Sequence, residues 1–348
     1  MHLVIDAVGN RFGGGVVILD EFTQLLGSGS GIDQVSVFVG RDTLLNVSKT
    51  DHVRFYPVGK FHDNVYGRID WYFRSLANGA RSLGADCILC LNGMGLGFEG
   101  IPVYHYVQQA LPHSPEALKS YPLAARLKFR LIRKIVFQSL IRSNGIIVQT
   151  GWMAKLLSDW LNPNAPILVA TPQVRIAGGV SDSSPSETKF FLYVGSDKPH
   201  KNLPMLVAGF KLVKVMFPDV ELHLTVQRDP KLVGEGVEFL GQIPRPELPD
   251  LYGRATALVM PSLIESLGLP LLEAQASGLP VLAADRPYAR DVCGDSAIYF
   301  DPLSPESIAR AVETILIQED LVGGMSGKGR ALYENHQEVS NMSQVVSF

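Results

Sequence analysis

Cysteine is scarce in this sequence, and long apolar runs are missing from it. Three cysteines among 348 residues is an odd and small number, which favours a chain kept in the reducing cytosol over a disulfide-stapled secreted domain. No run of about 18 apolar residues occurs, so we expect no membrane span. The N-terminal sequence MHLVIDAVGN lacks a basic segment followed by an apolar one, so we expect no secretory signal.

Motifs that bind metal ions are also missing. The sequence has no Asp-x-Asp pair and no cluster of His, Cys and Asp at ligand spacing, so we expect neither a structural nor a catalytic metal. Cys87 and Cys90 lie in one apolar run that is predicted to be a strand, with side chains on opposite faces. We interpret both as core residues, and Cys293 likewise.

The composition is that of a folded protein with room for two cores. Hydrophobic residues make up 46% of the chain and charged residues 19%, which argues against disorder, and the length predicts two domains. The net charge of −3 is unevenly divided, because residues 1–175 carry +5 and residues 176–348 carry −8. This asymmetry indicates that the first half meets an anionic partner.

Residues 257–285 are predicted to form a parallel βαβ unit. Two short apolar runs, Ala257–Met260 and Val281–Ala284, have the composition of buried strands. Between them, Pro270 suits the first turn of a helix and Gly278 suits its end. A crossover of this kind is right-handed and joins parallel strands.

Two glutamates lie eight positions apart in this unit, Glu265 in the loop and Glu273 in the predicted first turn of the helix. The free N–H groups of a helix N-terminus favour an anion such as a diphosphate, whereas carboxylates accept hydrogen bonds from hydroxyl groups. Diphosphate and hydroxyls together describe a nucleotide sugar. The spacing alone leaves a second interpretation open, in which Glu273 only complements the helix dipole and Glu265 is solvated.

The two glutamates, separated by seven residues within PSLIESLGLPLLEAQASGLPVLAAD, resemble the signature of glycosyltransferase family 4. The similarity continues through residues 286–302 and is weaker over residues 190–202 and in the first half. Membership implies an α/β fold of GT-B architecture, with two Rossmann-like domains facing each other across a cleft. It also implies retaining sugar transfer from a nucleotide sugar. Ser266 stands where many members have glycine.

The domain boundaries follow from composition and from the resemblance. The stretch 178–187 is rich in glycine, serine and proline and is the best linker in the chain. We expect an acceptor domain at 1–176, a linker at 177–188, a donor domain at 189–325 and a poorly patterned tail at 326–348. The family resemblance implies that this tail crosses back to the first domain.

The resemblance assigns donor-binding roles in the second half. Glu265 would hold hydroxyls of the transferred sugar, Glu273 those of the ribose, and Lys201 would pair with the diphosphate beside a helix N-terminus. Ser196 stands where the family usually has an arginine of this clamp, and Lys198 is a candidate substitute. Further donor contacts are expected from one turn and from the motif loop, namely Gly241, Ile243, Ser266, Leu267, Gly268 and Leu269.

The first half also carries candidate ligand contacts. Gly14 and Gly15 follow a short strand and precede a helical pattern, as at the opening of a Rossmann-like domain. The resemblance gives this loop a donor contact, and a merely tight turn is the alternative. Arg11 is an acceptor-side candidate, as is Gln109, which stands where some members have asparagine. His105 is predicted at or near a strand end, as a ligand-contacting residue or as a structural one.

Residues 122–142 are predicted to form a long amphipathic helix. Leu123, Leu127 and Leu131 recur every four positions. A basic stripe lies on another face, made of Arg126, Arg130, Arg133 and Lys134. Such a helix can rest on an anionic membrane surface, and a solvated basic face is the alternative.

We therefore expect a retaining, metal-independent hexosyltransferase that uses a GDP- or UDP-sugar and needs no cofactor. Its acceptor would be a saccharide or a lipid-linked saccharide in polysaccharide or lipopolysaccharide assembly of the O-antigen type. Catalysis is assigned to Glu265, Lys201 and His105. The enzyme would work in the cytoplasm or peripherally at the inner face of the membrane, without nucleic acid. Another GT-B enzyme, such as a nucleotide-sugar hydrolase or epimerase, and a non-catalytic nucleotide-sugar-binding protein are the alternatives.

Overall fold

The computed structural model describes residues 1–10, 14–26, 32–40, 53–59, 65–96, 98–161, 165–173, 186 and 188–338. Within these ranges the chain forms two compact units. Unit 1 draws on residues 1–113 and 123–173, and unit 2 on residues 114–122 and 174–339. Nearly all of the predicted linker lies outside the described residues, as do Arg11 and residues 339–348 of the tail.

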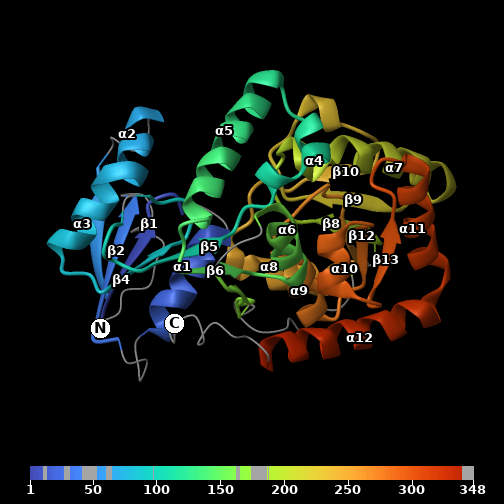
Figure 1. The fold of residues 1–348 in the computed structure, drawn as a ribbon. Helices are drawn as coiled ribbons and strands as arrows, with labels where there is room; N and C mark the ends of the chain where they lie inside the picture. The colour runs from blue at the N-terminus through green and yellow to red at the C-terminus, as the bar shows by residue number, and fades with distance from the viewer. Residues whose placement is uncertain are drawn as a thin grey trace. The chain divides into compact units, whose positions relative to one another are not determined.

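In the described part of unit 1, seven parallel strands form one sheet in the order β3-β2-β1-β4-β5-β6-β7 (Figure 1). Short runs rich in β-branched residues produce inner strands that are buried on both faces, as parallel strands between helical layers are, whereas the outer strands β3 and β7 are only partly buried. The strands are β1 (His2–Ala7), β2 (Gln34–Gly40), β3 (Val53–Val58), β4 (Cys87–Cys90), β5 (Val103–Val107), β6 (Gly145–Val148) and β7 (Ile167–Val169). The strand order reverses between β1 and β4, and such a switch point is where open α/β sheets bind ligands.

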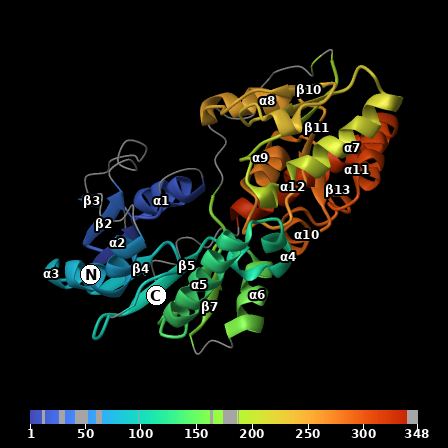
Figure 2. The same ribbon diagram turned by 90° about the horizontal axis from the view of Figure 1, so that it is seen from above.

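Helices cover both faces of this sheet (Figure 2). One face packs against Ile18, Leu19 and Phe22 of α1. The other face packs against Trp71 and Leu76, which belong to an unbroken helical run through α2, η3 and α3. The described helices of unit 1 are α1 (Gly14–Leu25), α2 (Val65–Asp70), the π-helix η3 (Trp71–Ser75), α3 (Leu76–Ser82), the 3-10 turn η4 (Leu111–His113), α5 (Leu123–Leu140) and α6 (Gly151–Leu161).

The three cysteines are free and buried, which confirms their interpretation as core residues. Cys87 packs on the α1 side of the first sheet and Cys90 on the side of Trp71. The two side chains therefore lie on opposite faces of β4, as the strand alternation predicts.

Unit 2 repeats the same arrangement with six described parallel strands, in the order β10-β9-β8-β11-β12-β13. Its order reverses between β8 and β11, so unit 2 has a switch point of its own. The predicted strands Ala257–Met260 and Val281–Ala284 occur with those bounds. The strands are β8 (Phe190–Tyr193), β9 (Glu221–Leu224), β10 (Val237–Phe239), β11 (Ala257–Met260), β12 (Val281–Ala284) and β13 (Ala297–Phe300).

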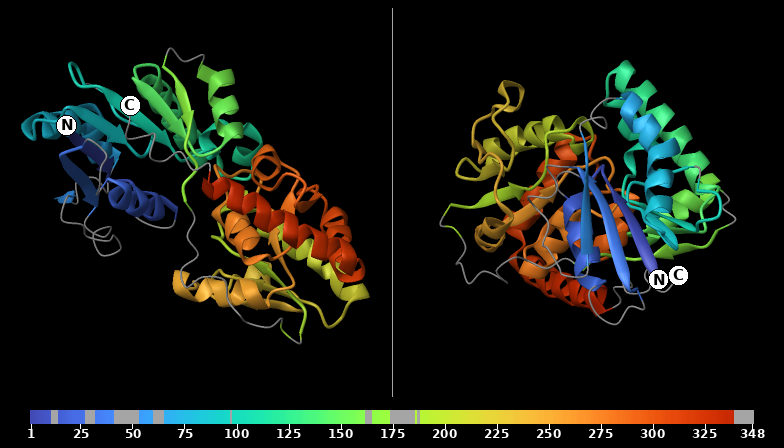
Figure 3. Two further views of the ribbon diagram at one scale, coloured as in Figure 1. Left: turned by 90° about the horizontal axis from the view of Figure 1, so that it is seen from below. Right: turned by 90° about the vertical axis from the view of Figure 1, so that its left-hand side faces the viewer.

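Two helical segments of unit 2 depart from the sequence prediction. Helix α4, in the half expected to be a continuous domain 1–176, belongs to unit 2, where Glu116 and Arg286 form an ion pair of 2.7 Å. The tail is helical up to Glu338 and packs on α9 (Figure 3). The described helices are α4 (Pro115–Lys119), η5 (Pro199–Lys201), α7 (Leu203–Met216), η6 (Pro230–Leu232), η7 (Arg245–Glu247), α8 (Leu248–Arg254), α9 (Leu269–Ser277), α10 (Pro287–Cys293), α11 (Pro305–Ile317) and α12 (Glu319–Glu338).

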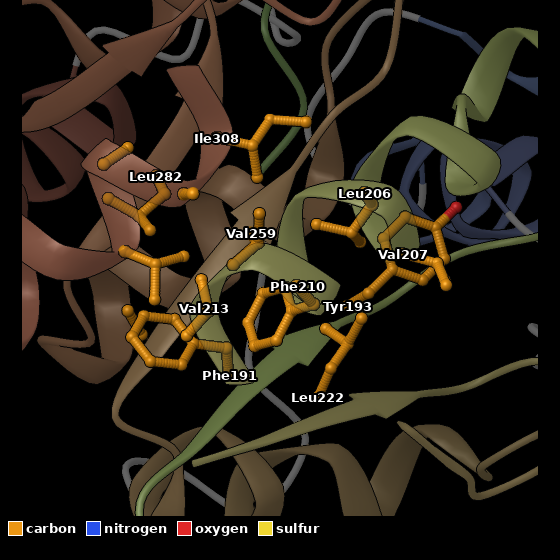
Figure 4. Packing of buried hydrophobic residues seen from close by; sticks show 14 of the residues in the cluster. Phe191, Tyr193, Leu206, Val207, Phe210, Val213, Leu222, Val259, Leu282 and Ile308 are labelled. Atoms are coloured by element: carbon orange, nitrogen blue, oxygen red, sulfur yellow. The ribbon is translucent and has the colours of Figure 1, made fainter. Parts of the chain in front are cut away.

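The core of unit 2 joins the sheet to α7 and α11 (Figure 4). Phe191 of β8 meets Phe210 of α7 edge to face, with ring centroids 5.5 Å apart. Ile308 of α11 packs so close to Gly209 that a Cβ there would lie 2.8 Å from it. This tight packing holds β8 and β11 rigidly, and the loops that follow these two strands carry the candidate site. Among the described residues, no helix combines the length and apolarity that crossing a membrane requires.

Candidate functional site

The switch point of unit 2 brings Lys201 and Glu265 together. Lys201 ends η5, which follows β8, and Glu265 lies in the loop after the neighbouring strand β11. Lys201 Nζ lies 2.5 Å from Glu265 Oε1, and the two side chains are only 15% and 14% exposed. Partial exclusion of water strengthens their attraction beyond that of a surface pair. Two residues that the sequence analysis assigns to donor binding therefore form one charged centre.

The loop after β8 is shaped by contacts that the sequence does not reveal. Tyr193 Oη donates a hydrogen bond of 2.7 Å to the carbonyl oxygen of Ser196. A Cβ on Gly195 would lie 2.6 Å from that hydroxyl, so only glycine fits beneath it. The loop therefore passes directly over the Tyr193 ring, with Ser196 contributing its backbone carbonyl to the fold.

Asn202 lies between η5 and α7. Its backbone lies in the left-handed region, with φ of 59°, and its side chain makes no capping bond to α7. Instead Nδ2 donates to the carbonyl oxygens of Pro261, at 3.3 Å, and of Pro302, at 2.7 Å. Asparagine tolerates left-handed backbone better than most residues, and this one fastens the Lys201 turn to the loop that carries Glu265.

The sequence analysis missed two residues beside this centre, His200 and Tyr121. Tyr121 Oη and His200 Nδ1 lie 2.6 Å apart, and their rings are stacked. Burial lowers the pKa of His200 to about 4 although Glu265 acts in the opposite direction. The imidazole is therefore neutral at physiological pH. The adjacency of His200 to Lys201 was the available signal, whereas nothing in the sequence links Tyr121 to either residue.

The motif loop is held in place by glycine geometry and by buried side chains. Gly268 has φ of +80°, a backbone conformation that favours glycine, and directly precedes α9. Leu267 is 2% exposed, while Ser266 is half-buried and Leu269 opens the helix. The Tyr288 hydroxyl donates to the carbonyl oxygen of Ser262 at 3.0 Å. The start of α9 and the Glu265 loop are thereby fixed in advance of any ligand.

Glu273 is the fifth residue of α9 and lies just beyond the first turn in which it was predicted, because the helix already begins at Leu269. Its side chain is only 8% exposed, and both carboxylate oxygens are engaged. Oε1 accepts from Arg245 at 2.9 Å, and Oε2 accepts from the buried Tyr252 hydroxyl at 2.7 Å. The carboxylate is thus paired with a guanidinium group and hydrogen-bonded to a hydroxyl group. These are specific contacts, which an acid that only complements the helix dipole would not need.

The turn that carries the predicted donor contacts Gly241 and Ile243 leads into the same cluster. Gly241 has φ of +72°, and its N–H donates to the Val226 carbonyl at 3.2 Å. Ile243 is half-buried, and Arg245, two residues later, is the partner of Glu273. The turn after β10 and the second motif glutamate are thus joined by a single guanidinium group.

The switch point of unit 1 is lined by Gly14, Gly15 and a buried acid. Asn10 Nδ2 donates to the Gly15 carbonyl at 3.0 Å, which closes the turn into α1. Asp6, on β1, is fully buried and accepts from Trp71 Nε1 at 3.0 Å. Burial raises the pKa of this carboxyl to about 6, against the hydrogen bond from Trp71 that acts to lower it. The sequence analysis passed over Asp6 because a lone acid in an apolar strand carries no motif.

His105 lies in the middle of β5 rather than at its end. It is 1% exposed, and its Nδ1 lies 3.0 Å from Ser143 Oγ. Burial lowers its pKa to about 4, so the ring is neutral at physiological pH. Gln109 is exposed. His105 is thus a core histidine that is bonded through Nδ1, while its buried Nε2 has no hydrogen-bond partner among the described residues. Any catalytic role for it remains a prediction.

Comparison with known proteins agrees with this arrangement. Residues 181–332 match the family described as Glycosyl transferases group 1. Over 165 residues the chain is 29% identical to the O-antigen chain mannosyltransferase RfbU of Salmonella typhimurium, an alignment that covers 45% of each protein. The chain therefore spans less than half the length of this curated relative.

Two solved structures resemble the whole chain. One is WaaG, a glycosyltransferase involved in lipopolysaccharide biosynthesis, with a TM-score of 0.75 at 18% identity over 100% of this chain and 98% of that one. The other is HepE from Anabaena in complex with UDP-glucose, with a TM-score of 0.75 at 14% identity over 100% and 98%. At these identities the likeness establishes the fold, and it confirms the predicted GT-B architecture of two Rossmann-like units. The chain thus has the GT-B fold, and its residues 181–332 match the family model of the glycosyl transferases of group 1.

Proposed function

We propose that this protein is a glycosyltransferase that moves a hexose from a nucleotide-diphosphate sugar to a saccharide or lipid-linked saccharide. The observation that carries the proposal is the Lys201–Glu265 pair at the switch point of unit 2, inside the segment that matches the family. The name of the Salmonella relative, an O-antigen chain mannosyltransferase, supports polysaccharide assembly of the O-antigen type. The HepE complex supports a nucleotide sugar as donor.

In the proposed reaction Lys201 changes partner. Without donor its ammonium is held by Glu265 at 2.5 Å. A diphosphate bound at this loop would compete for the ammonium, and the released Glu265 carboxylate would accept hydrogen bonds from sugar hydroxyls. As the glycosidic bond to the diphosphate breaks, negative charge grows on the leaving oxygen, and the pre-placed ammonium would stabilise it. Retention of the anomeric configuration and independence from metal ions are parts of this proposal.

Glu273 is proposed to hold the ribose while Arg245 and Tyr252 keep its carboxylate in position. Arg245 is 41% exposed whereas Glu273 is almost fully buried. An incoming nucleotide would therefore meet the Arg245 guanidinium first. That group would stay bonded to the Glu273 carboxylate while the carboxylate accepts hydrogen bonds from the ribose hydroxyls.

The proposal is tested by incubating the full chain with GDP- and UDP-hexoses, with and without a saccharide acceptor and in the presence of EDTA. We expect one donor to be consumed, with transfer to the acceptor that EDTA leaves unchanged. Proton coupling constants of the product report its anomeric configuration. Donor cleavage without transfer to any acceptor would favour a hydrolase, and binding without turnover would favour a non-catalytic protein.

We also propose that unit 1 contacts an anionic membrane surface through α5. Leu123, Leu127 and Leu131 are 68%, 53% and 54% exposed and follow one face at four-residue spacing. Basic side chains are exposed on the same helix, at Lys128, Arg130 and Lys134. Exposed leucines beside basic groups suit insertion between anionic headgroups. Arg133 instead stacks on Trp160, 5.1 Å from the ring centroid, so it belongs to the packing of unit 1.

The helical run α2–η3, also in unit 1, carries two further exposed apolar side chains. Its Ile69 and Phe73 are 42% and 47% exposed. A basic helix face that is only solvated does not account for these exposed apolar side chains or for the exposed leucines of α5. Contact with a membrane would account for both. Such peripheral contact would place the enzyme at the cytoplasmic leaflet, which carries anionic lipid.

Vesicle flotation with phosphatidylglycerol tests the membrane contact. Arg130→Glu combined with Lys134→Glu is expected to abolish binding. The charge-matched control is Lys231→Glu with Arg310→Glu, two exposed basic positions of unit 2, which should leave binding intact. Equal binding by both double variants would end this part of the proposal.

A further inference from the structure

A histidine and two glutamates meet at the edge of the second sheet, on the strands β9 and β10. Glu221 and His223 are two positions apart on β9, so their side chains lie on the same face. Glu238 of the edge strand β10 is the register partner of His223. Leu222 and Leu224 between and after them point into the core. The sequence pattern Glu-x-His gives two of the three members of this cluster, and only the pairing of β10 with β9 supplies the third.

The polar atoms of this cluster converge on one point. His223 Nε2 lies 2.8 Å from Glu221 Oε2 and 3.0 Å from Glu238 Oε2. One ligand atom from each of the three residues lies within 4.8 Å of the others. A zinc ion with bonds of about 2.0–2.2 Å in tetrahedral geometry keeps its ligand atoms roughly 3.3 Å apart. The two distances from His223 Nε2 to the carboxylate oxygens need to widen by a few tenths of an ångström to reach this spacing.

Stacking and burial fix the orientation of the His223 imidazole. The His223 ring lies flat on the Phe190 ring, with centroids 4.2 Å apart and planes 13° from parallel, and its side chain is 13% exposed. The two carboxylates are 40% and 55% exposed, so water can complete the coordination. One nitrogen and two carboxylate oxygens suit a borderline divalent ion such as Zn²⁺, because Mg²⁺ and Ca²⁺ prefer oxygen alone.

We propose that Glu221, His223 and Glu238 form a divalent transition-metal site, with Zn²⁺ as the reference ion, that fastens the edge strand β10 to β9. The site occupies strands distinct from β8 and β11, whose loops carry Lys201 and Glu265. It is therefore a structural site, and it stands independently of the proposed transfer reaction. Binding to the folded chain alone raises thermal stability by mass action.

The test is zinc titration of the untagged, EDTA-treated full chain by calorimetry, with thermal unfolding followed in parallel. We expect one high-affinity zinc ion and a rise in Tm of several degrees at saturation. His223→Phe keeps the stacking on Phe190 and removes the nitrogen, and Glu238→Gln removes an exposed carboxylate. Each should weaken zinc at least tenfold and remove the gain in Tm.

The control is Glu235→Gln, an exposed glutamate just before β10, which should bind zinc as the unaltered chain does. Substitution with Co²⁺ should give the visible absorption of a low-coordinate site in the unaltered chain and in this control. If the chain binds no stoichiometric zinc, the cluster is an ion pair only and the proposal is wrong. It is equally wrong if His223→Phe binds zinc with unchanged affinity. Sugar transfer is measured separately, so either result leaves the proposed function unaffected.

Discussion

Replacing Lys201 by glutamine separates the two roles that this residue is given, in folding and in donor binding. The change removes the partner of Glu265 at a site where both side chains are about 15% exposed. A charge-assisted hydrogen bond is worth about 1.5–3 kcal/mol, and the orphaned carboxylate adds a desolvation cost. We therefore expect a loss of about 2 kcal/mol in the free energy of unfolding and a fall in Tm of about 4–8 °C.

Lys201→Gln should also weaken the binding of the donor, for a reason separate from its effect on stability. Without the ammonium, Glu265 presents an unpaired negative charge to the diphosphate, so attraction is lost and repulsion is gained. We expect the Kd of the nucleoside diphosphate, measured by calorimetry, to rise about 10- to 100-fold, or about 1.4–2.8 kcal/mol. Combining Lys201→Gln with Glu265→Gln should recover much of the stability without recovering the affinity for the nucleotide.

The comparison variant for this pair of measurements is Lys198→Gln, which also tests whether Lys198 substitutes for the missing arginine of the diphosphate clamp. Lys198 is exposed in the same loop, three residues earlier. We expect near-native stability and no more than a threefold change in nucleotide affinity. If Lys198→Gln weakens the nucleotide as much as Lys201→Gln does, Lys201 is not the diphosphate ligand. If the double variant is no more stable than Lys201→Gln, the carboxylate was not orphaned, and the energetic argument fails.

Three further substitutions test other parts of the structure. Asp6 has a pKa raised from 3.8 to about 6, so its ionised form costs stability above pH 6 and the cost disappears as the pH falls towards 4. Asp6→Asn should therefore raise the free energy of unfolding by about 3 kcal/mol at pH 7.5 and by almost nothing at pH 4, in urea unfolding. An equal gain at both pH values would contradict the shift. Tyr252→Phe removes one hydrogen bond from buried Glu273 and should cost about 1–3 kcal/mol by urea midpoint, while an unchanged midpoint would mean that water replaces the hydroxyl. Asn202→Gly relieves a left-handed φ but leaves two loop carbonyls without their donor, so a net loss of about 1–2 kcal/mol is expected, and a gain in Tm would show that backbone strain outweighs those bonds.

Local chemistry fixed much of the architecture in advance. The strands Ala257–Met260 and Val281–Ala284 and the left-handed Gly278 that ends the helix between them occur as predicted. Short apolar runs and the conformational limits of proline and glycine act within a few residues, so they can be recognised without the fold. The same reasoning placed Glu265 in a loop and Lys201 beside a helix N-terminus, and the fold brings the two side chains together.

Local pattern failed where the structure depends on distant parts of the chain. His105 was expected near a strand end, yet it is buried in mid-strand beside Ser143. Tyr121 lies 79 positions from His200 and still reaches its ring. Residues 328–338 looked unpatterned, yet α12 packs against α9, with Gly329 beside Gln275 and Arg330 donating a hydrogen bond of 3.4 Å to the Ser277 carbonyl. None of these contacts leaves a spacing signal.

The amino-acid sequence by itself therefore determined the strands, the loops and the family signature, because these follow from local propensity and short-range pattern. The tertiary structure alone decided which charges became partners. Glu273 was visible as one half of a motif, but its pairing with Arg245 and Tyr252 required α8 and α9 to pack together. Likewise, Glu221, His223 and Glu238 became a cluster only through the parallel register of β9 and β10, which is set by burial of their apolar neighbours.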